Sequence, residues 1–331
     1  MPLFSNYQVQ NRNFDDPSLG VFCWQRCSDF SINAAHVKQF LCFFWRNSIF
    51  MDTPFLPVEL ERKIFELSAS IHPECALTLV RVARRLRIWI KPLLYRTFTI
   101  DLRTPRPEFP RLSLGAISKL VALDPQAVRD HTRHVCFVEL SKVDGPVIID
   151  FLSRCAVVVD LAFMSAGPRF EEPHPDAFAA LSLRRLSVSR LSLSMLGRAV
   201  FAGHSIFSRL THLDILDFGD CNHYGGPQTV LQRMPCLTHL STAPGPKSLS
   251  DSALRQVMVV CEKLEVLVFR YPTQQDLDED RARTQITDDP RFVMLVVPDR
   301  VLDWELGTQG GEDYWAVASA LAMRRNRVEG E

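Results

Sequence analysis

Ser187, His212 and Asp214 are residue types that could together carry out nucleophilic catalysis. A serine hydroxyl activated by a histidine, which a carboxylate orients, is the arrangement used by many acyl-transfer enzymes. These three residues fall on neighbouring strands of a predicted sheet, and a gently curved sheet offers no pocket in which they could converge. Residues 203–205 (GHS) lack the closing glycine of a nucleophile elbow, and the sequence contains no phosphate-binding glycine motif. We therefore expect that the protein is not an enzyme.

The nine cysteines are irregularly spaced, and none of them forms a CxxC pair of the kind found in zinc sites. The sequence therefore predicts no metal site and no cofactor. Cys136, Cys155 and Cys261 lie among apolar residues and are expected to pack as small core side chains. The sequence has no secretory signal pattern, so we expect a reducing compartment, the cytoplasm and/or the nucleus.

Positive and negative charges balance, with 38 Lys and Arg residues against 38 Asp and Glu residues. A neutral chain has no general attraction for nucleic acid or for an anionic membrane. The most apolar short segment, residues 40–45 (FLCFFW), is far shorter than the roughly 20 residues that a membrane-spanning helix needs. We expect neither nucleic acid nor a membrane as a partner.

Leucines return at a fixed interval in the second half of the chain. Leu183 and Leu186 begin a pattern LxxL whose leucines recur at 210 and 213, at 237 and 240, and at 264 and 267, a step of 27 residues each time. Related units begin at Thr132, at Val158 and, one residue late, at Phe292. In each unit the fourth and sixth residues share one face of a strand because side chains alternate along a strand. Seven such units predict an α/β solenoid with parallel strands on one side and helices on the other.

The rest of the chain divides around this repeat. We expect a loosely ordered extension over residues 1–52, a helical module over 53–98, the solenoid over 99–303 and a capping helix with a tail over 304–331. The capping helix is predicted near residues 312–325, with Trp315, Ala318 and Ala322 covering the last repeat.

Side chains that flank the inward leucines should form the strand-side surface of the solenoid. Parallel pairing at the predicted register would align Arg185, His212 and His239 side by side. A surface of mixed charge with apolar patches is typical of protein–protein contacts. The predicted client-binding face therefore comprises Arg185, Ser187, His212, Asp214, His239, Ser241, Val268 and Arg270.

Three short helical patterns precede the repeat. Pro57 suits a first helical turn, and Leu60, Ile64, Leu67 and Ile71 then form one apolar stripe. Two further apolar patterns follow, with breaks at prolines. Three helices this short bury little surface alone, so they need one another, a partner or the rest of the chain.

Residues 56–98 resemble an F-box, in particular the F-box-like modules of mushroom-forming fungi. The resemblance rests on the opening Leu56-Pro57-x-Glu59, on Ile64-Phe65, on Val82-Ala83-Arg84, and on Trp89 followed by Pro92-Leu93-Leu94-Tyr95-Arg96. It implies docking onto the Skp-type adaptor of a cullin-RING ubiquitin ligase through an apolar face. The residues that the resemblance assigns to that face are Leu56, Pro57, Leu60, Ile64, Leu79 and Val82. The repeat is similar to degenerate leucine-rich repeats of the kind that follow F-box modules.

Two functions are consistent with these features. In the first, the chain is a substrate-recognition subunit of an SCF-type ubiquitin ligase that holds an unknown protein client on its solenoid. In the second, it is a leucine-rich-repeat scaffold without ligase function, and the helical module only caps the solenoid.

Overall fold

The computed structural model describes residues 56–101, 111–139, 145–164, 181–188, 205–216, 230–243, 251–282 and 288–329. The predicted extension over residues 1–52 and the apolar segment 40–45 lie outside the described residues. The described chain divides into two compact units, with the boundary between Leu94 and Tyr95.

The helical unit contains α3 (Val58–Ile71), α4 (Pro73–Val82) and α5 (Arg84–Leu94). Pro57 stands at the N-cap of α3, where a missing N–H costs no helical hydrogen bond. A small core holds the three helices together, made by Phe65, Ala69, Ala76, Leu79, Leu86 and Ile90.

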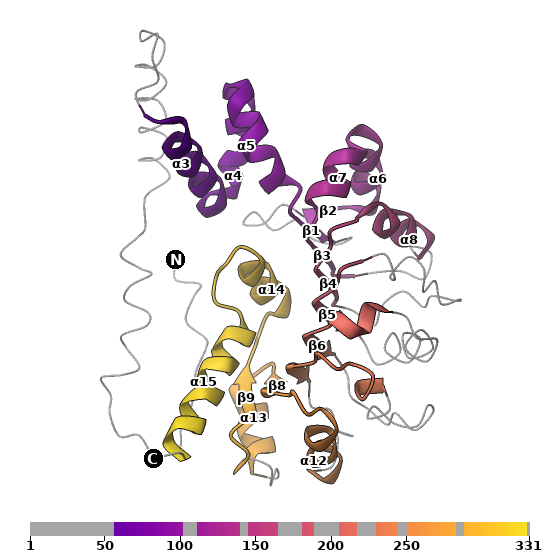
Figure 1. The fold of residues 1–331 in the computed structure, drawn as a ribbon, viewed down its shortest axis with the longest axis vertical. Coiled ribbons are helices and arrows are strands. Elements are labelled where there is room, and N and C mark those ends of the chain that lie inside the picture. Colours follow the sequence, from indigo (N-terminus) through magenta and orange to yellow (C-terminus); the bar gives the residue numbers. More distant parts are fainter. Residues whose placement is uncertain are drawn as a thin grey trace. The chain divides into compact units, whose positions relative to one another are not determined.

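The second unit is built on one parallel sheet, whose strand order is β2-β1-β3-β4-β5-β6-β7-β8-β9 (Figure 1). Its strands are β1 (Thr97–Ile100), β2 (Arg111–Leu112), β3 (His134–Phe137), β4 (Asp160–Phe163), β5 (Arg185–Val188), β6 (His212–Ile215), β7 (His239–Thr242), β8 (Val266–Tyr271) and β9 (Phe292–Val296). Seven of these are the predicted repeat strands. The sheet also includes β1 and β2, so the boundary predicted at residue 98 is corrected: Thr97 and Phe98 belong to the sheet.

The predicted register is confirmed over the central strands. Leu186 pairs with Leu161 on one side and with Leu213 on the other, and Leu213 pairs with Leu240, which pairs with Leu267. All five leucines are buried in one continuous core. The fold is therefore α/β and solenoid-like, as the spacing of 27 residues predicts.

Helices cover one face of this sheet (Figure 1). They are α6 (Leu114–Leu123), α7 (Pro125–His131), α8 (Gly145–Arg154), the 3-10 turn η2 (Ser205–Arg209), α12 (Asp251–Val260) and α13 (Gln274–Arg281). The three predicted core cysteines, Cys136, Cys155 and Cys261, are buried within the unit. Burial raises the pKa of the Cys155 thiol to about 12 and that of Cys261 to about 11.

The chain ends in two helices that lie on the opposite face of the sheet, α14 (Arg300–Thr308) and α15 (Tyr314–Glu329) (Figure 1). We call this face the inner face and residues 299–329 the C-terminal strap. The predicted burial of Trp315, Ala318 and Ala322 is confirmed, because all three pack on the inner face of β8 and β9 in a second apolar core.

The last strand pairs in a different register from the predicted one. The sequence aligns Leu295 with Leu267, whereas the structure pairs Phe292 with Leu267. A shift of three residues exchanges the two faces of a strand. Phe292 therefore enters the core beneath the helices, and Leu295 joins Val293 and Val297 against the strap.

Candidate functional site

The residues of the predicted client-binding face lie in the predicted rows on the inner face. Arg185, His212 and His239 are direct neighbours on β5, β6 and β7. Ser187, Asp214, Ser241 and Val268 form the next row.

The expectation that this face is open is wrong for most of its residues. Asp214 is 3% exposed, Arg270 is 2% exposed and Val268 is fully buried, and Ser187 and Ser241 are buried as well. The physical reason is the apolar patch of β8 and β9, which the strap covers by packing back on the sheet.

Polar contacts anchor the α14 part of the strap. Trp304 Nε1 donates to Asp160 Oδ1 of β4 at 3.1 Å. Arg111 of β2 donates through Nη2 to Glu305 Oε2 at 3.2 Å and through Nη1 to Asp101 Oδ2 at 2.8 Å. All three ionised groups of this cluster are at most a few per cent exposed, so their charges are paired where water could not solvate them.

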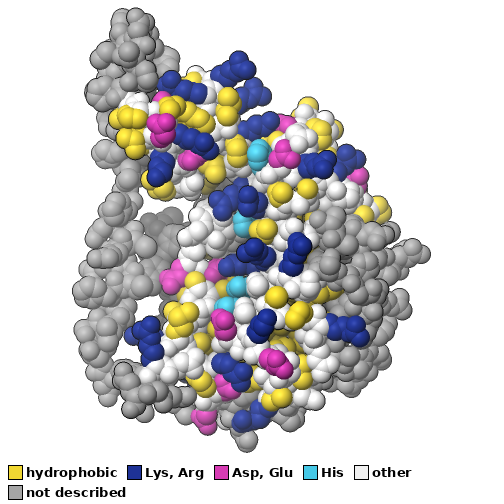
Figure 2. Space-filling model, viewed as in Figure 1, with side chains coloured by type: hydrophobic (Ala, Val, Ile, Leu, Met, Phe, Trp, Pro, Cys, Tyr) yellow, Lys and Arg dark blue, Asp and Glu magenta, His cyan; other side chains and the backbone are white. Residues whose placement is uncertain are grey.

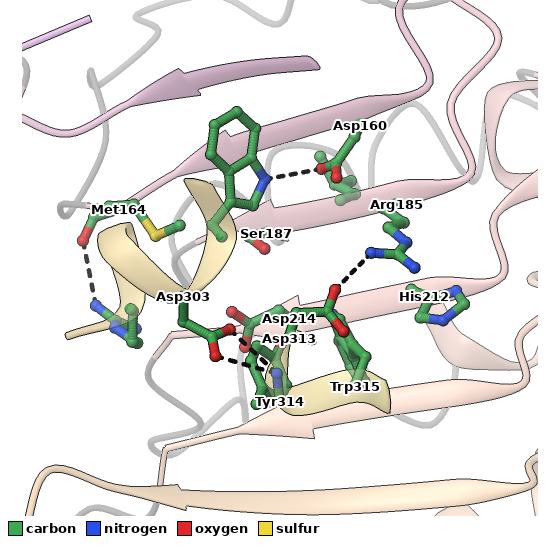
Figure 3. Close-up of a pocket in the computed structure, with 13 residues that line it drawn as sticks. Asp160, Met164, Arg185, Ser187, His212, Asp214, Asp303, Asp313, Tyr314 and Trp315 are labelled. Carbon is green, nitrogen blue, oxygen red and sulfur yellow. Dashed lines mark hydrogen bonds and ion pairs between the residues drawn. The ribbon is translucent and has the colours of Figure 1, made fainter. Parts of the chain in front are cut away.

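The start of α15 is held by two aspartates. Asp303 accepts hydrogen bonds from Tyr314 N through both carboxylate oxygens, at 3.1 and 3.3 Å. Asp313 Oδ1 accepts from Ala316 N at 2.9 Å, which satisfies an open N–H group of the first helical turn. The other oxygen, Asp313 Oδ2, accepts from Arg185 Nη1 at 2.8 Å (Figure 3). One carboxylate therefore both caps α15 and fixes it to β5.

Trp315 covers two stacked histidines. The rings of His212 and His239 are 4.1 Å apart and nearly parallel, at 10°. The edge of each meets the Trp315 ring system, at centroid distances of 5.1 and 5.8 Å. His239 Nε2 is also 2.9 Å from Ser319 Oγ of α15. Burial, His239 and Arg185 together lower the pKa of His212 to about 2, and burial lowers the pKa of His239 as well.

A buried arginine organises the next row. Arg270 Nε donates to Ser241 Oγ at 2.6 Å, and Arg270 Nη2 is paired with Asp214. The guanidinium carbon lies 5.3 Å from the centroid of the Tyr314 ring, a cation–π arrangement. Residues of the sheet therefore hold the Arg270 side chain in place, and its guanidinium contacts Tyr314 of the strap.

A small cavity remains between the strap and β4–β6. Asp160, Arg185, His212, Asp214, Trp304 and Tyr314 are among the residues that line it (Figure 3). Its volume of about 20 Å³ is enough for a water molecule. Sites for small molecules usually measure about 300–1,000 Å³.

The geometry also gives His212 and Asp214 partners other than those of a catalytic triad. His212 Nδ1 is 2.9 Å from Thr211 Oγ1, the residue next to it in sequence. Asp214 is paired with Arg270 rather than with a histidine. Neither arrangement orients an imidazole toward a serine hydroxyl.

The six residues predicted to bind an adaptor all belong to the helical unit, and five of them are at least partly exposed. Leu60 and Val82 are about half exposed, at 50% and 49%, Pro57 is exposed, and Ile64 and Leu56 are partly buried. Leu79 is 1% exposed and belongs to the core between the helices. Its expected place on the docking face is therefore corrected.

The helical unit exposes more apolar side chains than the six residues predicted to bind an adaptor. Further apolar side chains that are at least half exposed are Val58, Leu67, Ile71, Leu77 and Ile88. In Figure 2 the helical unit carries hydrophobic side chains at its surface among lysines and arginines. On α3 the exposed residues Leu60, Leu67 and Ile71 recur at helical spacing. That spacing is the signal in the sequence that could have added Leu67 and Ile71 to the site.

No family model matches the chain, and no curated protein matches it either. Within the described part of the chain, no helix is both long and apolar enough to cross a membrane. Among the same residues, no cluster of three His, Cys, Asp or Glu side chains is arranged to hold a metal ion.

Proposed function

We propose that the protein is the substrate-recognition subunit of an SCF-type cullin-RING ubiquitin ligase. In this proposal the helical unit docks on a Skp-type adaptor, and the solenoid holds a protein client near the ligase. The chemistry belongs to other subunits, and the chain acts by raising the effective concentration of the client. Such a role belongs to the cytoplasm or the nucleus.

One observation carries the proposal, the exposed apolar stripe of α3. Leu60, Leu67 and Ile71 are 50%, 60% and 54% exposed on one side of the helix, while Phe65 and Ala69 on the other side make the core. Burying a leucine or isoleucine fully is worth about 1.5–3 kcal/mol, so an apolar stripe that stays at the surface favours a partner. The resemblance of residues 56–98 to an F-box supports an adaptor as that partner.

The test is adaptor binding by the full chain and by two matched variants. We expect a purified Skp-type adaptor to bind the wild-type chain, and we expect Leu60→Asp to weaken binding by about 30-fold or more, because the new carboxylate would be desolvated at the contact. The control is Leu123→Asp, at an 82% exposed leucine of α6 in the other unit, which should bind like wild type.

Hydrogen exchange of α3, α4 and α5 in Leu60→Asp separates the two functions considered. Native-like exchange is expected, because Leu60 lies outside the core of the unit. Loss of protection in all three helices would favour the scaffold in which this unit only caps the solenoid. Wild-type binding that Leu60→Asp leaves unchanged, or no binding by the wild-type chain, would refute the proposal.

A further inference from the structure

We propose that the inner face recognises clients through an acidic residue followed by two aromatic residues at the start of a helix, and that the chain's own Asp313, Tyr314 and Trp315 occupy this site until a client replaces them. The inference rests on the proposed function, because it names the class of client that the solenoid would hold. It assigns a partner chemistry to a face that the strap covers in the structure.

The acidic position is defined by Arg185. Its side chain is 38% exposed, and its guanidinium donates to the Asp313 carboxylate at 2.8 Å. The same carboxylate caps the first turn of α15 through Ala316 N. A client helix with Asp at its N-cap would present a carboxylate in this geometry, whereas a lysine there would meet Arg185 with like charge.

The two aromatic positions are defined by side chains that the sheet itself holds in place. Arg270 is fixed by Asp214 and Ser241 and faces the ring of Tyr314. His212 and His239 stack on each other, and their edges meet Trp315. These face residues gain their orientation from neighbouring strands, so the site keeps its shape when the strap is exchanged for a similar helix.

Two features make exchange of α15, the second helix of the strap, possible. Residues 309–312, which join α14 to α15, are all exposed, and Gly310 has a φ of +85° that suits a glycine hinge. The cavity of about 20 Å³ is lined by Arg185, Trp315 and other residues of the same contact, so the strap fills the site incompletely. A client with a better-fitting helix start can therefore compete with it.

The charges of the site favour a protein over other ligands. On the sheet the site combines the Arg185 cation with the carboxylates of Asp160 and Asp214, and such mixed charge is typical of a protein contact rather than of a phosphate-binding surface. With the strap in place, the remaining volume is far below that of a small-molecule site.

The experiment uses the full chain and a fluorescent peptide with the sequence of residues 312–325 (EDYWAVASALAMRR). Fluorescence anisotropy measures peptide binding to the wild-type chain and to Trp315→Ala, in which the strap is weakened. We expect Trp315→Ala to bind the peptide about tenfold more tightly than wild type, because its own strap competes less. Adding Arg185→Glu, or replacing the peptide's aspartate with lysine, should remove about tenfold of that affinity.

The matched control is Met323→Ala, at a residue of α15 that is 59% exposed and points away from the sheet core. It should bind the peptide like wild type. If Trp315→Ala does not keep the wild-type circular dichroism, Asp313→Ala weakens the strap at a residue outside the apolar core and takes its place. A folded variant that binds the peptide no better than wild type, or binds it equally well with Arg185→Glu, would overturn the inference.

A measurement on the unmutated chain completes the test. In a ¹⁵N-labelled wild-type chain, excess unlabelled peptide should speed hydrogen exchange in α15, and the lysine peptide should not. Unchanged exchange would also overturn the inference. Adaptor binding without peptide exchange would refute only this inference, and peptide exchange without adaptor binding would refute only the ligase function.

Discussion

Acidification from pH 7 to pH 5 should destabilise strands β6 and β7 of the sheet through His212. Burial against Trp315, together with His239 and Arg185, lowers the pKa of His212 from 6.5 to about 2. The folded state therefore keeps this imidazole neutral at pH 5, while the opened state binds a proton below pH 6.5. The contribution of the neutral His212 to the free energy of opening is fully present above pH 6.5. It falls as the pH drops below 6.5, because the opened state then binds more protons than the folded state.

The magnitude follows from the interval between pH 6.5 and pH 5. Each pH unit in this range costs about 1.4 kcal/mol for one such group, so His212 alone contributes a loss of about 2 kcal/mol at pH 5. The lowered pKa of His239 acts in the same direction. The wild-type chain should therefore lose at least about 2 kcal/mol of opening free energy in β6 and β7.

Native-state hydrogen exchange of β6 and β7, corrected for intrinsic exchange rates, measures this free energy at each pH. The comparison variant is His212→Asn, which keeps a polar side chain of similar shape and cannot be protonated. Its stability at pH 7 reports the loss of stacking, and its difference between pH 7 and pH 5 should be about 2 kcal/mol smaller than that of wild type. Equal pH differences in the two proteins would refute the reasoning.

Two further predictions concern residues that hold the strap or face it. Arg270→Ala should destabilise the solenoid unit by about 3–5 kcal/mol in urea unfolding, because it leaves the Asp214 carboxylate buried without its partner, whereas the double change Arg270→Met with Asp214→Leu should cost much less. Gly307→Ala would place a Cβ 2.8 Å from Asp313 Cβ and should speed hydrogen exchange in α15, with a loss of about 1–3 kcal/mol. Gly115→Ala is its control, since a Cβ there meets no atom within 4 Å. Unchanged exchange in Gly307→Ala would contradict the tight contact.

The sequence predicted the central strands because identical steps of 27 residues align the leucines of neighbouring strands in only one register. Leu186, Leu213 and Leu240 are each preceded by a second buried leucine three residues earlier, so a slip would expose both. The last strand lacks this constraint. In residues 292–297 (FVMLVV) five of the six side chains are buried, and both faces are apolar, so the sequence fits more than one register.

The covered inner face could not be predicted from the polar rows alone. Arg185, His212 and His239 have the composition of a solvent-exposed surface, and only the structure brings the strap to them. A signal was nevertheless present in β8, where Val266 and Val268 alternate with Leu267 and Phe269. A strand that is apolar on both faces is covered on both faces. The same ambiguity affects α3, whose sequence has apolar residues on two sides and does not tell which side packs in the unit.

Stability alone does not explain why the inner face carries polar residues beneath the strap. Buried ion pairs such as the one between Arg270 and Asp214 add little stability compared with well-packed apolar side chains of similar size. The strap meets the sheet through apolar residues at β8 and β9 and through charged and histidine side chains at β4 to β7. If covering the sheet were its only task, apolar contacts along the whole face would hold it more firmly. Polar rows instead provide directional contacts that distinguish one helix from another, and water can solvate these rows when the strap is released. This division favours a strap whose helix α15 is recognised by directional polar contacts at its start and can be replaced by a client helix that makes the same contacts.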